Sequence, residues 1–217
     1  MRGIEKGKSF IKDKETKPME RYKVRLTFTQ PILGTTPKDP EVYGTYIAGQ
    51  AALTDEAIAE ELATVEKVEE KGWTGFHKLP DGTPILYDYV IKGFFKDACS
   101  MLRRVKNTRS EKMTAFKKNI DGLVFVEPRQ IPLLVNGGKM DILERPLRAQ
   151  TAQGERVALA RSDTCPVGTK LEFELTILGG IDEKTLQEWL DYGKYRGLGQ
   201  WRNGGYGSFT YEMEAAA

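Results

Sequence analysis

The chain has 217 residues, of which 40% are hydrophobic and 29% charged, with a formal net charge of +2. This composition is that of an ordinary soluble domain, long enough to bury a substantial core. No run approaches the roughly 20 apolar residues that span a membrane. The N-terminus lacks the apolar segment of a signal peptide, so we expect a cytoplasmic protein without a membrane partner.

The cysteines and the single histidine argue against a metal protein. Cys99 and Cys165 lie far apart in the sequence, and without a secretory signal we expect two reduced thiols. A zinc site is disfavoured because His77 is the one histidine and no paired cysteine spacing occurs. We therefore expect neither a metal nor a cofactor.

Charge is distributed unevenly along the chain. Residues 54–70 carry seven acidic side chains against one lysine, and residues 92–118 carry nine basic side chains against two acidic ones. We interpret the acidic segment as a solvated face. The basic segment suits a nucleic-acid surface.

Periodicity predicts the elements of the N-terminal half in chain order. Residues 22–30 alternate apolar and polar side chains, as in a half-buried strand, and residues 54–72 have the N-cap and acidic first turn of a helix. Residues 85–91 then predict a strand that feeds a helix through Gly93. Lys92 and Lys96 are expected at the start of this helix, where free backbone N–H groups favour a phosphate. Short strands are predicted at 123–126 and 131–135.

The C-terminal half predicts more strands and one further helix. Residues 143–161 predict a long hairpin with its tip at 151–154, residues 171–177 a strand, residues 182–192 a capped helix, and residues 209–213 a final strand. The element order indicates an α+β protein with a mainly antiparallel sheet. The leading topology is a ferredoxin-like (RRM-like) core with helices on one face and the hairpin inserted.

The expected domain organisation follows from these elements. Residues 1–20 are expected to be a flexible tail, and residues 21–213 a single domain with an insertion at about 35–82. Residues 214–217 are expected to be a second tail.

The segment 193–209 is rich in glycine, arginine and aromatic residues. It holds six glycines, interleaved with Arg196, Trp201, Arg202, Asn203 and Tyr206. Glycine lets a ligand approach the backbone closely, arginine supplies forked donors for phosphate, and aromatic rings supply faces on which bases stack. Such a loop suits a polyanion that carries π-faces.

Three segments together resemble the RAMP superfamily of CRISPR-associated proteins, and in particular its small backbone subunits that bind guide RNA. The chain carries IKGFFKDA at residues 91–98, CPVGTKLEFEL at 165–175, and GLG at 197–199 followed by GYG at 205–207. The resemblance covers residues 85–213 and extends to 22–34. The segment 35–82 matches nothing in the pattern.

The resemblance implies sequence-independent binding of single-stranded RNA by a repeating subunit of a CRISPR-type ribonucleoprotein. Implied partners are single-stranded RNA, other subunits of a multi-subunit complex, and further copies of the chain along the RNA. The residues expected to contact RNA come from the 92–96 step and the basic helix after it, the hairpin, and the glycine-rich loop; they are Lys92, Gly93, Lys96, Arg103, Arg145, Arg148, Arg161, Trp201, Arg202, Gly204, Gly205 and Tyr206. Core packing is an equal interpretation of Trp201 and Tyr206, and ordinary exposed charge is favoured for Arg148 and Arg161.

Two alternatives remain open. A phage-encoded or repurposed relative would be an interaction protein that mimics or blocks such a subunit. Some relatives are endoribonucleases, for which His77 as general acid–base or Asp39 as a metal-dependent group would be the candidates. We expect His77 to be a surface or turn histidine and Asp39 a turn residue, and hence no enzyme.

Overall fold

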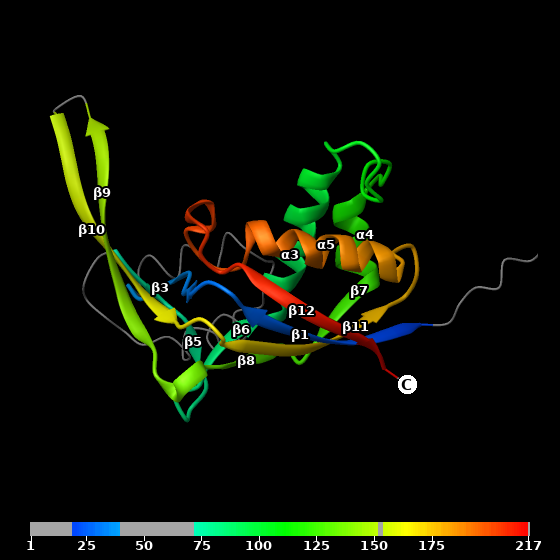
Figure 1. The fold of residues 1–217 in the computed structure, drawn as a ribbon, viewed down its shortest axis with the longest axis horizontal. Helices are drawn as coiled ribbons and strands as arrows, with labels where there is room; N and C mark the ends of the chain where they lie inside the picture. The colour runs from blue at the N-terminus through cyan, green and yellow to red at the C-terminus, as the bar shows by residue number, and fades with distance from the viewer. Residues whose placement is uncertain (1–18, 40–71, 152–153, 217) are drawn as a thin grey trace, which may run out of the picture.

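The computed structural model describes residues 19–39, 72–151 and 154–216. It shows an α+β fold with three α-helices in these ranges and predominantly antiparallel sheets, as expected from the sequence (Figure 1). The predicted N-terminal tail, the acidic helix at 54–70, most of the 35–82 insertion and the centre of the hairpin tip lie outside the described residues.

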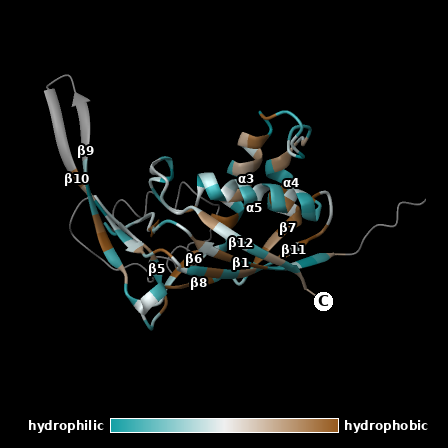
Figure 2. Cartoon of the chain, in the orientation of Figure 1, coloured by the Kyte–Doolittle hydropathy of each residue, from teal (hydrophilic) through white to brown (hydrophobic). Residues whose placement is uncertain are grey.

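The larger sheet has the order β12-β1-β11-β8-β6-β5, with β7 also paired to β11. Its bounds are β1 Glu20–Phe28, β5 His77–Lys78, β6 Pro84–Tyr87, β7 Val124–Glu127, β8 Gln130–Leu134, β11 Lys170–Ile177 and β12 Phe209–Ala215. In β1 every second residue is buried, which confirms the predicted half-buried strand. Figure 2 shows hydrophobic and hydrophilic residues interleaved along these strands. Because β12 extends to Ala215, the predicted C-terminal tail begins later than residue 214.

Three helices lie together on one face of this sheet: α3 Asp88–Leu102, α4 Phe116–Leu123 and α5 Glu183–Arg196 (Figure 1). The core between sheet and helices is aromatic, with the Phe95 ring 5.6 Å from Trp189 and the Phe94 ring 5.4 Å from Phe209. Trp189 is fully buried, and a side chain of this kind contributes about 1.5–3 kcal/mol through burial. Asp182 caps α5 as predicted, by accepting a hydrogen bond of 2.8 Å from the backbone N–H of Thr185.

A second sheet has the order β2-β10-β4-β3, with β9 paired to β10. Its strands are β2 Ile32–Leu33, β3 Thr36–Pro37, β4 Trp73–Gly75, β9 Asp141–Thr151 and β10 Gly154–Cys165. The β9–β10 hairpin confirms the prediction at 143–161, and its far end projects away from the body of the molecule (Figure 1). We did not predict the strands β2, β3 and β4 of this sheet, because strands of two or three residues are too short to show periodicity. The strand β4 pairs with β10 in parallel.

The predicted start of the first described helix is wrong. The strand β6 ends at Tyr87, and α3 begins at Asp88 rather than after Gly93. The reason is the spacing of the buried side chains, which fall on one helical face as Ile91, Phe94, Phe95, Ala98 and Cys99. The helix α4 was also missed. It spans eight residues, and its two buried side chains are too few to make a stripe.

Candidate nucleic-acid interface

The glycine-rich loop is closed at its base by backbone contact. Leu198 donates a hydrogen bond of 2.9 Å to the carbonyl of Gly207, and Gly207 donates one of the same length to Pro31. A Cβ on Gly207 would lie 1.7 Å from the Leu198 carbonyl oxygen, and Gly207 has φ of 73°. The GLG and GYG motifs therefore meet each other and hold the segment between them as a fixed loop.

Trp201 occupies the left-handed region with φ of 54°, which is uncommon for a bulky residue. This conformation places its ring edge-on to Tyr206, with 6.2 Å between ring centroids. The guanidinium of Arg145 from β9 lies over the Trp201 ring at 5.1 Å. The base of the hairpin and the glycine-rich loop are thus joined by a cation–π contact.

Arg145 is exposed to solvent and carries a positive charge. It makes no ion pair with any residue in the part of the chain that the structure describes, and it borders a hollow of about 340 Å³ with Leu143, Gly204 and Tyr206. An arginine resting on an aromatic ring retains most of its donors for a phosphate. Glu144 also borders this hollow, but it pairs with Arg161 at 2.7 Å.

Arg202 is held by a carboxylate. Its NH1 donates to Asp97 Oδ2 at 2.9 Å, and Arg196 Nε donates to the same oxygen at 2.8 Å. Arg196 also donates to Asn203 Oδ1 at 2.7 Å. Asp97 therefore draws two arginines together at the loop. One negative charge between two positive charges leaves the cluster net positive.

The backbone N–H groups of Gly204 and Gly205 already donate hydrogen bonds within the loop. Gly204 donates to the Trp201 carbonyl at 2.8 Å and Gly205 to the Arg202 carbonyl at 3.0 Å. The expectation that these amides face a phosphate has no support in this geometry, because they close the 3-10 turn at Arg202–Gly204. Gly204 contributes differently, because its missing side chain keeps the space beside Tyr206 and Arg145 open.

The two hairpin arginines with described side chains point to opposite faces. Glu144 stands opposite Arg161 in the β9–β10 register, so the neighbouring Arg145 projects to the other face. Arg161 lies 5.8 Å from the Trp73 ring, beside a buried ion pair of 2.9 Å between Lys38 and Asp163. Arg148 is opposite Val157, and its side chain lies outside the described part of the structure. Of the hairpin arginines with described side chains, Arg145 is therefore the one that reaches the glycine-rich loop.

Lys92, Gly93 and Lys96 lie within α3, not at its start, so the predicted phosphate site on free N–H groups is not formed. Lys96 pairs with Asp121 of α4, and Lys92 lies 5.1 Å from the ring of Phe125 in β7. These lysines face α4 and β7, whereas Asp97 faces the glycine-rich loop. Near the end of the helix, the Arg103 guanidinium lies 5.2 Å from the Phe116 ring.

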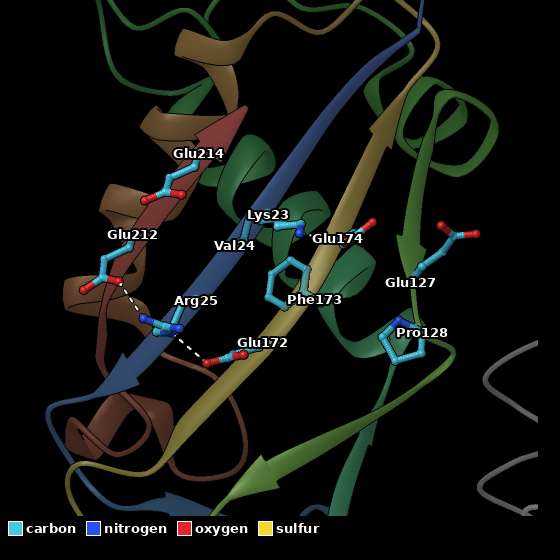
Figure 3. Close-up of a pocket in the computed structure, with 10 residues that line it drawn as sticks. All are labelled: Lys23, Val24, Arg25, Glu127, Pro128, Glu172, Phe173, Glu174, Glu212 and Glu214. Atoms are coloured by element: carbon cyan, nitrogen blue, oxygen red, sulfur yellow. Dashed lines mark hydrogen bonds and ion pairs between the residues drawn. The ribbon is translucent and has the colours of Figure 1, made fainter. Parts of the chain in front are cut away.

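The outer face of the larger sheet, opposite the helices, is acidic. Arg25 bridges Glu172 and Glu212 at 2.7 and 3.2 Å, and Lys23 lies 3.9 Å from Glu174 (Figure 3). Further glutamates at 127 and 214 border the same hollow, which has a volume of about 500 Å³. Five glutamates against two basic groups repel a polyanion, so this face does not suit RNA.

The two catalytic candidates lie in different surroundings. His77 is not a surface or turn residue: it is buried in β5, its ring is 4.8 Å from Tyr87, and burial lowers its pKa to about 4. Asp39 lies in a bend after β3 and is partly buried. Within the described ranges, no group of three or more His, Cys, Asp or Glu residues is arranged to hold a metal ion.

Both cysteines are free and buried. Burial raises the pKa of the Cys99 thiol and raises that of Cys165 to about 12, so both thiols are neutral. None of the helices in the described ranges has the length and apolarity that a membrane crossing requires.

No family model and no curated protein matches the sequence. Among solved structures, the chain is similar to a chain of the type III-B Cmr-beta cryo-EM structure bound to cognate target RNA, with a TM-score of 0.53 and 14% identity over 91% of this chain. This likeness shows that the chain shares its fold with a chain of that CRISPR complex. The match covers 61% of that other chain, so the present chain spans less than two thirds of its length. A type IV-B CRISPR complex chain is similar at a TM-score of 0.44, with 13% identity and 91% of both chains covered.

Sequence reasoning missed three residues near the loop: Asp97, Lys194 and Tyr195. Lys194 and Tyr195 border a hollow of about 730 Å³ beside Gly204 and Tyr206. Tyr195 could have been recognised, because it falls off the buried face of α5 and its aromatic side chain therefore has no place in the core. Asp97 carried no sequence signal, since its two arginine partners are about 100 residues away.

Proposed function

We propose that the protein is an RNA-binding subunit of a CRISPR-type ribonucleoprotein and grips single-stranded RNA without sequence preference. The observation that carries this proposal is Arg145, which is exposed, has no ion pair among the described residues, and rests on the Trp201 ring beside the open space at Gly204. Phosphate contacts from arginine and stacking on aromatic rings are the two interactions that hold single strands. The shared fold with a chain of an RNA-bound complex supports the proposal.

We further propose that the core is ferredoxin-like. Leaving out β2–β6, α4 and the β9–β10 hairpin, and treating β7 and β8 as one interrupted strand, the order of elements is strand, helix, strand, strand, helix, strand, and these strands have the sheet order β12-β1-β11-β8. This is the arrangement of a ferredoxin-like fold. The β9–β10 hairpin is then an insertion between the second and third strands, and it presents Arg145 to the loop before the last strand.

The test measures the affinity of three single variants for single-stranded RNA, one of which is a charge-matched control. Arg145→Ala removes a phosphate contact and should lower the affinity and reduce the salt slope by about 0.7. Trp201→Ala removes a stacking ring and should cost about 1–3 kcal/mol of binding. Lys23→Ala, on the acidic sheet face, makes the same charge change as Arg145→Ala and should leave both quantities unchanged. Equal losses in all three variants would contradict the proposed site.

The repeating role predicts self-association along RNA. Size-exclusion chromatography of the protein with and without a long single-stranded RNA should show assemblies of several copies only with RNA. A single copy on a long strand would leave RNA binding intact but refute the backbone role.

We propose that the protein is not a nuclease. A buried imidazole with a pKa of about 4 is neutral and closed off from solvent, so His77 is not placed to act as general acid. Labelled RNA incubated with the protein and Mg²⁺ should remain intact. Cleavage that Asp39→Ala or His77→Ala abolishes would overturn this.

The acidic sheet face favours a second candidate, a RAMP-like interaction protein that binds a basic protein partner. The two functions differ in what copurifies with the protein. An RNA-gripping subunit should carry nucleic acid and a high ratio of absorbance at 260 to 280 nm, whereas an interaction protein should elute without nucleic acid.

A further inference from the structure

Tyr195 is an aromatic side chain that the fold does not use. It lies in the last turn of α5 and is 80% exposed, the highest value among the exposed large hydrophobic side chains of the described residues. Its neighbours in sequence are both held: Lys194 pairs with Asp191 at 2.8 Å, and Arg196 pairs with Asp97. A ring this exposed contributes little to folding and presents a free face.

The hollow beside Tyr195 has no acidic side chain in its lining, so it does not repel a polyanion. It is formed by the end of α5, the turn at Thr29–Pro31 and the glycine-rich loop, and it has a volume of about 730 Å³. Lys194 is the one charged residue among those that line it. The hollow on the acidic sheet face is lined by five glutamates. Single-stranded RNA is therefore repelled at the sheet face but not at the hollow beside Tyr195.

Gly204 and Tyr206 border both this hollow and the one that contains Arg145. The two hollows are therefore adjacent. Gly204 has no side chain, and a Cβ there would come within 3.5 Å of Tyr206 and 3.7 Å of Arg145. A strand held at Arg145 can pass over Gly204 and reach the end of α5.

We infer that the RNA path continues from Arg145 and Trp201 across Gly204 to Tyr195, where a base stacks on the tyrosine ring. This inference rests on the proposed RNA-binding function. The ligand is single-stranded RNA of any sequence, because stacking uses the π-face that every base has. Tyr195 is then a second stacking position, separate from Trp201.

The experiment compares Tyr195→Ala, Tyr195→Leu and Tyr195→Phe in the full chain, with oligouridines of about 4 and about 16 nucleotides, the range of site sizes in single-strand-binding domains. For the longer RNA, Tyr195→Ala and Tyr195→Leu should lower affinity about 5-fold or more. Tyr195→Phe keeps the ring and should stay within about a factor of two. The shorter RNA, bound at Arg145 and Trp201, should be unaffected. Unchanged thermal unfolding checks that the variants are folded.

The outcomes separate the two claims. If Arg145→Ala and Trp201→Ala weaken binding of the longer RNA but Tyr195→Ala does not, the proposed function stands and the second stacking position is refuted. An equal loss with Tyr195→Phe would also refute it, because the ring itself would then be irrelevant. If the wild-type protein binds neither RNA, the proposed function fails and this inference fails with it.

Discussion

Acidification should destabilise the protein through His77. This is the one histidine in the chain, it is 6% exposed, and burial lowers its pKa from 6.5 to about 4. Between these two values the unfolded state binds a proton that the folded state excludes, so stability falls as pH decreases from 6.5 towards 4. At about 1.4 kcal/mol per unit, the full loss is about 3 kcal/mol, of which about 2 kcal/mol is reached at pH 5.

Urea unfolding at pH 7, 6 and 5 measures this loss. His77→Gln serves as the reference, since it keeps a polar side chain but does not titrate and therefore reports the contribution of all other groups. The difference in unfolding free energy between wild type and variant should change by about 2 kcal/mol from pH 7 to pH 5. An imidazole NMR resonance that titrates near pH 6.5 in the folded protein, together with parallel pH profiles, would refute the reasoning.

Three further predictions concern stability and the loop. Asp163→Ala should destabilise the protein by about 3–5 kcal/mol in urea unfolding, because it leaves a buried lysine without its carboxylate; a loss below about 1 kcal/mol would argue against a buried pair. Gly207→Ala should disrupt the loop and lower the melting temperature, whereas Gly204→Ala should melt like wild type but bind RNA more weakly; the reverse order would contradict the roles given to the two glycines. Burial raises the pKa of Asp182, but hydrogen bonds from Thr185 and the positive charges of Arg109 and Lys184 together lower it by more, so the net pKa is below the ordinary value. Asp182→Ala should therefore cost about 1 kcal/mol at neutral pH, and this cost should shrink as pH falls from the ordinary Asp pKa of about 3.9 through the lower folded-state pKa; a cost independent of pH would exclude the cap.

Much of the fold was predictable because it depends on local patterns. The alternation in β1 and β11, the Asp182 cap and the hairpin register each leave a signal within a few residues. The start of α3 was not predictable in this way, since residues 84–91 are apolar and aromatic enough to suit a strand. What decides it is that Ile91 is buried on the same helix face as Phe94 and Phe95, which pack against distant aromatic side chains.

The site was predictable in composition but not in arrangement. The glycine-rich loop was recognised, yet the sequence does not reveal that Asp97 holds Arg202 or that Arg145 and Arg161 project from opposite faces of the hairpin. These are contacts between residues far apart in the chain. Burial of His77 was missed for the same reason, because the strand that contains it has two residues and is buried by other segments.

The central claim is that Arg145 and Trp201 form the grip on single-stranded RNA. Its most direct test is the binding of a labelled oligouridine across a salt series, for wild type and for the double variant Arg145→Ala/Trp201→Ala. The wild-type affinity should fall linearly with the logarithm of salt concentration, and the double variant should bind at least about 10-fold more weakly with a salt slope smaller by about 0.7. Equal affinity and equal slope in the two proteins, or no binding by wild type at about 50 mM salt, would contradict the account.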